Sequence, residues 1–331
     1  FVNSGNANVF TGSEGQTAVK EIAKAVSAAL KCPTSSVFMA STGVIGEKLN
    51  YKKIITKIPK MSENLKEGNW NKAATAITTT DTFPKGASEV ALIGNKKIQI
   101  TGIAKGSGMI APDMATMLSF IFTDANIPSS ILQTLLSRNV QNTFNAITVD
   151  SDASTSDTLL LFATGAAKSI APTSADDPVL KDFELGLQSV MLNLAKQIVC
   201  DGEGAQKLIQ VNVTGANSKK SAHKIGLAIA NSPLVKTAIA GGDANWGRVV
   251  MAVGKSGEKA NPDKISVCFG KTTIAEKGAV VEGYDEAPVT EHLQGREIHI
   301  TVDVGLGNGK STVWTCDLTH GYIEINADYR S

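Results

Sequence analysis

A glycine-rich loop runs directly into an apolar strand at Lys105–Asp124, KGSGMIAPDMATMLSFIFTD, and Thr116 stands at the junction. A hydroxyl at such a junction can attack the carbonyl carbon of the preceding residue, here Ala115. Hydrolysis of the resulting ester breaks the chain between Ala115 and Thr116 and leaves Thr116 with a free α-amine. Because an α-amine has a pKa of about 7.7–8.0, it can accept the proton of its own hydroxyl near neutral pH. The segment therefore indicates a nucleophile activated by its own terminus, a chemistry that needs no histidine.

Thr116 also has an ordinary structural explanation. Threonine is β-branched and favoured in strands, so composition alone favours a residue with no chemical role. The four histidines, His223, His292, His299 and His320, show no paired spacing, and His299 falls in an alternating strand pattern that predicts a structural role. A Ser-His-Asp triad stays open, because its members need not be neighbours in the chain.

Gly305–Thr312, GLGNGKST, resembles the loop that binds nucleotide phosphates. That loop requires a glycine where this chain has Val304, and a helix whose N-terminus faces the phosphate must follow it. The residues after Ser311 instead read as a strand, so we predict a turn between two strands. A nucleotide-binding module built on residues 304–312 is the non-enzymatic alternative, and we expect no nucleotide binding.

The cysteines Cys32, Cys200, Cys268 and Cys316 lie far apart, with no Cys-x-x-Cys pair and no histidine at the spacing of a metal ligand. The sequence therefore predicts four reduced thiols, with no zinc site and no disulfide framework. The chemistry of Thr116 needs neither a metal nor an organic cofactor, and we expect none.

The bulk composition is that of a globular protein with an ample core. Of 331 residues, 42% are hydrophobic and 19% are charged, and the net charge is +1. This balance creates no electrostatic attraction for nucleic acid or for an anionic membrane, so any ligand must be bound by a local site. No apolar run reaches the roughly 18 residues that span a bilayer. Since Phe1 opens no basic, apolar leader, we expect no signal peptide and a cytoplasmic protein.

Helical and strand periodicities alternate along the chain and must position these residues. Apolar residues at three- and four-residue spacing predict helices over 19–30, 131–144 and 183–198. Strands are predicted at 37–40, 89–93, 97–103, 116–123, 208–213, 248–253, 265–269, 298–304 and 312–317, with 89–103 as a hairpin. The mixed order predicts an α/β protein of layered sheets and helices, and 169–177 is the best loop or boundary.

Long blocks of this sequence resemble the ornithine acetyltransferase family, also called the glutamate N-acetyltransferase or ArgJ family. The blocks follow the family order over the whole chain. They are NSGNANVFTG (3–12), STGVIGEKL (41–49), TTDTFPK (79–85), KGSGMIAPDMATMLSFIFTDA (105–125), TVDSDASTSDT (148–158), DGEGA (201–205), NSPLVKTAIAGGDANWGR (231–248) and INADYRS (325–331).

The resemblance implies an inactive precursor that cleaves itself before a threonine into α and β chains, which stay together in a layered αββα sandwich of the ArgJ and DmpA type. By this resemblance Thr116 is that threonine. Residues 1–115 then form the α chain and residues 116–331 the β chain, in one intertwined catalytic unit. A smaller C-terminal α/β lobe is expected within about 206–310. Members assemble as two α and two β chains.

The family transfers the acetyl group of N2-acetylornithine to L-glutamate in arginine biosynthesis, and some members also take acetyl-CoA as donor. The resemblance therefore implies a glutamate N-acetyltransferase, an acyltransferase that acts through an acetyl-Thr116 intermediate in two half-reactions with ping-pong kinetics. Whether this chain also uses acetyl-CoA stays open.

The site residues of the family fall on defined positions of this chain. The oxyanion hole maps to Thr42 and Gly43, where an apolar strand is expected to end in a tight loop whose glycine lets the backbone approach closely. Lys105 is expected to hold a substrate carboxylate and Glu203 to face a substrate ammonium. The full set of substrate contacts implied by the resemblance is Thr82, Lys105, Thr116, Glu203, Asn326 and Ser331.

Several points qualify this resemblance. Thr79 and Thr80 share a motif with Thr82 and are the alternatives to it. Asp113 stands where the family usually has asparagine, three residues before the cut, and is expected to influence the rate of self-cleavage. The family also has strands before NSGNAN, so we expect a segment upstream of Phe1. The alternative enzyme is a self-cleaving amidohydrolase or aminopeptidase, which passes its acyl group to water and generally cleaves before serine.

Overall fold

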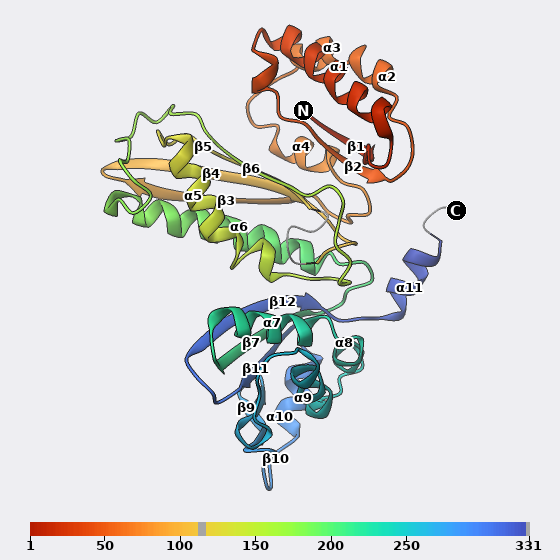
Figure 1. Cartoon of the computed structure of the whole chain (residues 1–331), viewed down its shortest axis with the longest axis vertical. Helices are drawn as coiled ribbons and strands as arrows, with labels where there is room; N and C mark the ends of the chain where they lie inside the picture. Colours follow the sequence, from red (N-terminus) through yellow and green to blue (C-terminus); the bar gives the residue numbers. More distant parts are fainter. Residues whose placement is uncertain (112–116, 329–331) are drawn as a thin grey trace.

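The computed structural model describes residues 1–111 and 117–328. An N-terminal unit, a central sheet and a C-terminal sheet lie one after another along the longest axis of the molecule (Figure 1). The layered α/β fold predicted from the sequence is confirmed. Within the described residues, no helix is both long enough and apolar enough to cross a membrane.

The N-terminal unit is built around a parallel pair of strands, β1 (Val2–Asn6) and β2 (Ala40–Val44). The chain between them forms α1 (Gly12–Leu30), which contains the predicted helix over 19–30, and the short 3₁₀ helix η1 (Thr34–Ser36). Three short helices follow, α2 (Tyr51–Ile55), α3 (Ile58–Glu63) and α4 (Trp70–Ala76).

The prediction for the second of these strands is partly wrong. The strand expected at 37–40 begins only at Ala40, and the tight loop expected at Ser41–Gly43 is part of it. The reason is the pairing with β1, since Ser41, Thr42 and Gly43 lie opposite Asn3, Ser4 and Gly5 in an unbroken register. Tertiary pairing thus extends a strand through residues whose local preference is for a turn.

The central sheet has the order β3-β4-β5-β6. The predicted hairpin is confirmed as β3 (Lys85–Ile93) and β4 (Lys96–Lys105), and β5 (Leu118–Thr123) lies antiparallel to β4. The last strand, β6 (Thr158–Ala163), runs parallel to β5.

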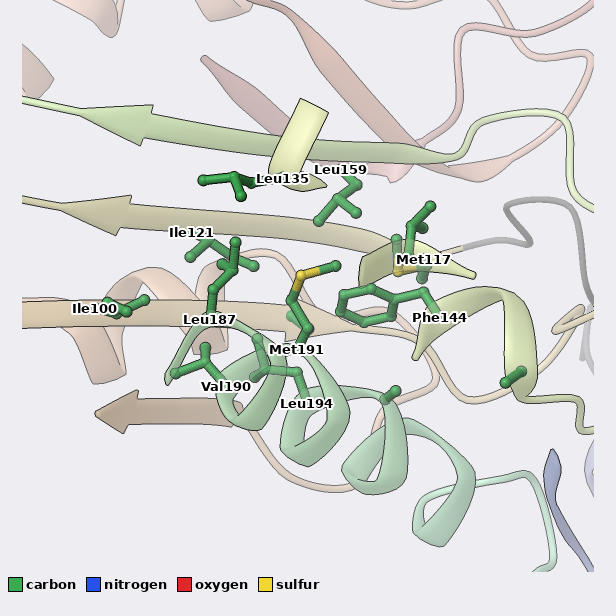
Figure 2. Close-up of a cluster of buried hydrophobic side chains, with 14 of the residues drawn as sticks. Ile100, Met117, Ile121, Leu135, Phe144, Leu159, Leu187, Val190, Met191 and Leu194 are labelled. Carbon is green, nitrogen blue, oxygen red and sulfur yellow. The ribbon is translucent and has the colours of Figure 1, made fainter. Parts of the chain in front are cut away.

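Helices and the N-terminal unit pack on the faces of this sheet. α6 (Lys181–Cys200) follows the 3₁₀ helix η3 (Pro178–Leu180) and confirms the predicted helix over 183–198. α5 (Ser129–Val140) ends earlier than predicted, and the 3₁₀ helix η2 (Phe144–Ala146) follows it. Figure 2 shows side chains of α6 meeting those of the strands, and this core contains Ile100, Met117, Ile121, Phe144, Leu187, Val190, Met191 and Leu194. A second cluster joins the sheet to β2 and α4 through Ala40, Ala74, Ile77, Ile103, Leu118 and Phe120.

The C-terminal sheet has the order β10-β9-β8-β11-β7-β12. Its strands are β7 (Leu208–Ala216), β8 (Ser266–Phe269), β9 (Thr272–Glu276), β10 (Ala279–Val280), β11 (Glu297–Asp303) and β12 (Gly309–Cys316). The helices are α7 (Lys219–Ala230), α8 (Pro233–Ala240), α9 (Trp246–Lys255) and α10 (Ala287–Gln294), with the 3₁₀ helix η4 (Pro262–Lys264). After β12 the chain leaves this sheet and forms α11 (His320–Ala327) (Figure 1).

The strand predicted at 248–253 is wrong, because these residues lie in α9. The side chain of Asn245 caps the helix by accepting the N–H of Arg248 at 3.2 Å. The buried residues Val249, Ala252 and Val253 follow a helical spacing. A run of only five apolar residues, 249–253, does not distinguish such a helix from a buried strand.

The turn predicted in place of a nucleotide-binding loop is confirmed. Residues 304–308 join β11 to β12, so a strand and not a helix follows the glycines. A side chain at Gly309 would overlap the backbone of Ser218, which gives this glycine a packing role.

Candidate active site

A cavity of about 370 Å³ lies where β2, the end of β4, the turn after α6 and α11 meet. Thr42, Gly43, Lys105, Glu203 and Asn326, all predicted from the sequence as site residues, contribute to its wall. Among the described residues, the lining is Ala7, Thr42, Gly43, Val44, Ile45, Thr79, Thr80, Lys105, Gly108, Met109, Ser154, Thr155, Ser156, Glu203 and Asn326.

The remaining predicted residues are placed differently. Asp113, Ala115, Thr116 and Ser331 lie outside the described residues. Thr82 is not among the residues that line the cavity, whereas its neighbours Thr79 and Thr80 are.

Gly43 occupies a position that only glycine can fill. Its φ of +130° belongs to the region that side-chain-bearing residues rarely adopt. A Cβ at this position would also overlap the carbonyl carbon of Gly5 and the nitrogen of Asn6, because β1 and β2 approach closely here. The glycine therefore brings the backbone of β2 to the cavity wall, beside Thr42, which is 2% exposed.

Lys105 is the last residue of β4, and only 3% of its side chain is exposed. Its ammonium group donates hydrogen bonds to the hydroxyl oxygens of Thr79 at 2.7 Å and of Thr42 at 3.3 Å. Among the described residues, the nearest carboxylate oxygen belongs to Asp81 and is 3.8 Å away. Burial lowers the pKa of Lys105, and the charge of Asp81 partly opposes this shift.

A buried charge network lies behind Lys105. Asp81 accepts the ammonium of Lys85 at 2.7 Å and the N–H of Gly106 at 2.7 Å. Burial alone would raise the pKa of Asp81, but the charges of Lys85 and Lys105 outweigh it and hold the pKa below its usual value. Because the Lys85 side chain is fully buried and also pairs with Asp201, removing its ammonium would deprive two buried carboxylates of this cation, at a cost of roughly 3–5 kcal/mol.

The same network explains the position of Thr82. Asp201, at the end of α6, lies 2.5 Å from the Lys85 ammonium. It also accepts the backbone N–H of Thr82 at 3.0 Å and the hydroxyl of Thr82. The Thr82 side chain thus holds the loop before β3 against the end of α6.

Glu203 and Asn326 meet across the cavity wall although they are far apart in the sequence. The side-chain amide of Asn326, on α11, donates to a carboxylate oxygen of Glu203 at 2.8 Å. Glu203 is 8% exposed, and a Cβ on Gly108 would lie 2.5 Å from its carboxylate group. The loop glycine therefore leaves the space that the carboxylate occupies, and α11 supplies its hydrogen-bond partner.

Asp150 holds the loop that leads toward residue 112. Its carboxylate accepts the N–H groups of Met109 at 2.6 Å and of Ile110 at 2.9 Å. Val149 adds to this clamp, because its N–H donates to the carbonyl of Ile110 at 2.8 Å. Val149 is held in turn by the buried ammonium of Lys236, which donates to the Val149 carbonyl.

Sequence reasoning missed Asp81, Lys85, Asp150 and Asp201. Asp81 and Lys85 stand four residues apart in TTDTFPK, and this spacing was the only local signal for an ion pair. Asp201 was not detectable, because its partners lie more than a hundred residues away.

The wall of the cavity can bind a zwitterionic ligand and polarise a carbonyl group. A buried ammonium and a buried carboxylate provide charges of both signs, and a strand backbone with a threonine hydroxyl provides donors. Within residues 1–111 and 117–328, no three His, Cys, Asp or Glu side chains gather as ligands for a metal ion.

The model of the ArgJ family matches residues 1–331. Two proteins named arginine biosynthesis bifunctional protein ArgJ, from Gluconobacter oxydans and Brucella suis, are 58% and 56% identical over 100% of this chain, which covers 78% and 81% of their lengths. A crystal structure of the protein of that name from Bacillus halodurans is similar with a TM-score of 0.63 and 43% identity, over 65% of this chain and 100% of that chain. The fold, the full-length family match and the identity to these relatives agree, and this chain belongs to the ArgJ family.

Proposed function

We propose that this protein is a glutamate N-acetyltransferase of arginine biosynthesis, which transfers the acetyl group of N2-acetylornithine to L-glutamate. It cleaves itself between Ala115 and Thr116 and works as an α2β2 assembly. Both amino-acid substrates carry charges of both signs, and the observation that supports the proposal best is the meeting of Lys105, Glu203 and the Thr42–Gly43 backbone in one cavity. The relatives described above are named as arginine biosynthesis proteins, which agrees with this assignment.

The reaction proceeds in two half-reactions. The hydroxyl oxygen of Thr116 attacks the acetyl carbonyl carbon, and the α-amine of Thr116 takes the hydroxyl proton. The bond from the acetyl carbon to the ornithine nitrogen then breaks, and that nitrogen leaves with the proton. Glutamate enters, its amine attacks the acetyl ester, and Thr116 leaves as the hydroxyl.

The cavity residues have distinct roles in this scheme. Lys105 binds a substrate carboxylate, and Glu203, held by Asn326, faces a substrate ammonium. Thr42 and Gly43 stabilise the negative oxygen of the tetrahedral intermediate, where losing one donor typically costs about 3–4 kcal/mol. Because the Thr42 hydroxyl oxygen accepts a hydrogen bond from Lys105, its own proton is available to donate.

The test is an acetyl-transfer assay on the purified full-length protein, with mass spectrometry of its chains. The proposal predicts two fragments that meet at 115/116, acetylglutamate as product, parallel double-reciprocal lines and an acetyl group on Thr116. A self-cleaving amidohydrolase would instead release acetate from acetylornithine at the same rate with or without glutamate. Thr116→Ala should remain one chain and lose transfer, and cleavage or transfer in this variant would refute the proposal. Replacing acetylornithine by acetyl-CoA in the same assay decides whether acetyl-CoA is a second donor.

A further inference from the structure

Met117, the residue after the proposed nucleophile, is fixed on both sides of its backbone. Its N–H donates to a carboxylate oxygen of Asp157 at 3.1 Å. Its carbonyl oxygen accepts the N–H of Thr158 at 3.1 Å. The next residue, Leu118, lies opposite Thr158 in the parallel pairing of β5 with β6. The Met117 backbone can therefore turn only if these bonds break.

The Met117 side chain is anchored as well. It is 2% exposed and belongs to the core between the central sheet and α6. Figure 2 shows it close to the ring of Phe144, at the end of the sheet. Contacts of both its main chain and its side chain thus fix the position of Met117, the residue that directly follows Thr116.

Asp157 differs from an exposed surface carboxylate in its burial and in its neighbours. It is half-buried, and no ion pair among the described residues includes it. It directly follows Ser154, Thr155 and Ser156, which line the cavity. Burial raises the pKa of its carboxyl to about 7, although the hydrogen bond from Met117 opposes the shift. Burying a carboxyl group without a cation beside it costs free energy of folding. The position of Asp157 therefore points to a role in the site.

We propose that Asp157 is a positioning residue for Thr116. Its carboxylate holds the nitrogen of the peptide bond that joins Thr116 to Met117, and so restricts the positions open to the Thr116 hydroxyl and, after cleavage, to its α-amine. Three covalent bonds separate the Met117 nitrogen from the α-nitrogen of Thr116, and the planar peptide ties the Met117 nitrogen to the Thr116 Cα, which carries both the nucleophile and its base. The inference rests on the proposed function, in which Thr116 is the nucleophile. Asp157 itself exchanges no proton in this scheme.

The consequence should be a loss of rate without a loss of binding. Misplacement of a reacting group by about 1 Å can cost on the order of a hundredfold in rate. Asp157 is not among the residues that line the cavity, so substrate affinity should persist. We expect Asp157→Ala to slow self-cleavage at least tenfold and to lower kcat per cleaved chain at least tenfold, with KM within twofold of the wild-type value.

The experiment uses full-length protein made by cell-free synthesis, so that cleavage can be followed from the start by denaturing electrophoresis and mass spectrometry. Asp157→Asn keeps an oxygen acceptor in the same place and should recover most of the lost rate. Asp177→Ala is the matched control, because Asp177 also accepts backbone N–H groups, those of Thr173 and Val179, but neighbours none of the cavity-lining residues in the sequence, whereas Asp157 directly follows three of them. This control should cleave and transfer like the wild type.

Two results would overturn the inference: wild-type rates in Asp157→Ala, or an equal loss in Asp157→Asn and Asp157→Ala while both keep the wild-type melting temperature. If Asp157→Ala does not fold, Asp157→Glu replaces it, because the longer side chain displaces the acceptor oxygen and must also lose rate. The Thr116→Ala variant, assayed in parallel, distinguishes failure of the proposed function from failure of the role proposed for Asp157. Cleavage in Thr116→Ala refutes the proposed function, whereas an intact Thr116→Ala beside a normally cleaving Asp157→Ala refutes only the role of Asp157.

Discussion

The ammonium group of Lys105 lies 3.3 Å from the hydroxyl oxygen of Thr42 and donates a hydrogen bond to it. This bond connects the buried charge network behind β4 with the strand that carries the proposed oxyanion donors. Since Asp81 and Thr79 also hold Lys105, the ammonium is fixed before any ligand enters. A preformed cation of this kind binds a carboxylate at a smaller entropic cost.

Lys105→Met should weaken substrate binding more than it impairs folding. A hydrogen bond to a charged group contributes about 1.5–3 kcal/mol, so KM for glutamate and for acetylornithine should rise roughly 10- to 100-fold. Lys96→Met is the control, because Lys96 is an exposed residue at the other end of the same strand. Steady-state kinetics measure both variants, and an unchanged KM in Lys105→Met would remove Lys105 from the binding site.

Gly43→Ala should disrupt the cavity wall. The new methyl group would collide with the backbone of Gly5 and Asn6, so β1 and β2 must separate. We expect kcat to fall on the order of a hundredfold or more, as for loss of an oxyanion donor. Gly254→Ala is the control, since a Cβ there meets open space within a helix. Wild-type transfer by Gly43→Ala would contradict the proposed oxyanion hole.

Asn326→Leu should reduce affinity by releasing the Glu203 carboxylate from its partner. A typical hydrogen bond to a charged group is worth about 1.5–3 kcal/mol, so KM should rise at least tenfold, with little change in melting temperature. Glu324→Gln, a change at an exposed residue of the same helix, should leave KM unaltered. Equal KM values in the two variants would show that α11 does not contribute to binding.

Asp157 should make the stability of the protein depend on pH. Its folded-state pKa of about 7 lies above the usual 3.8, so between these values the folded protein holds more protons than the unfolded chain. The free energy of unfolding therefore falls as pH rises through this window, and Asp157→Asn should show a shallower fall. Urea unfolding from pH 4 to 8, on the uncleaved Thr116→Ala background, measures the slope.

The control is Asp177, whose contribution to stability should change with pH in the opposite direction. Hydrogen bonds from the N–H groups of Val179 and Thr173 lower the pKa of Asp177. Its contribution to stability is present above the unfolded-state pKa and is lost as pH falls through the folded-state pKa. Asp177→Asn should therefore reduce stability at neutral pH and leave it unchanged in acid. A steeper fall with pH in Asp157→Asn would contradict the assignment for Asp157.

The long periodic elements were predictable, and the short ones were not. α1 and α6 show an unbroken apolar face over many turns, and the hairpin β3-β4 has a clear turn at Gly94–Asn95. α9 was mistaken for a strand, because its apolar run covers less than two helical turns and the cap at Asn245 was overlooked. β2 was shortened, because its partner strand lies more than thirty residues earlier in the chain.

The same distinction applies to the site: residues within a motif were predictable, whereas contacts between distant segments were not. Lys105 and Glu203 stand in distinctive motifs and could be proposed from the resemblance, and both line the cavity. Asn326 was also predicted as a site residue, but its bond to Glu203 and the contacts of Asp201 were not, because they depend on how the chain folds back. Thr82 is an example of a contact that the sequence did not reveal, since its hydroxyl donates to Asp201 and the residue is not among those that line the cavity.

The pairing of Lys105 with Leu118 across β4 and β5 has a mechanical consequence. A chain break between these residues opens a connection and leaves the hydrogen bonds of the central sheet whole. Neither piece could then be withdrawn without exposing the edge of a buried interior strand. If the protein is cleaved as proposed, its two pieces should therefore stay together as one particle on extreme dilution. Once unfolded, however, it should regain activity at a rate that depends on protein concentration, because two separate polypeptides must find each other again.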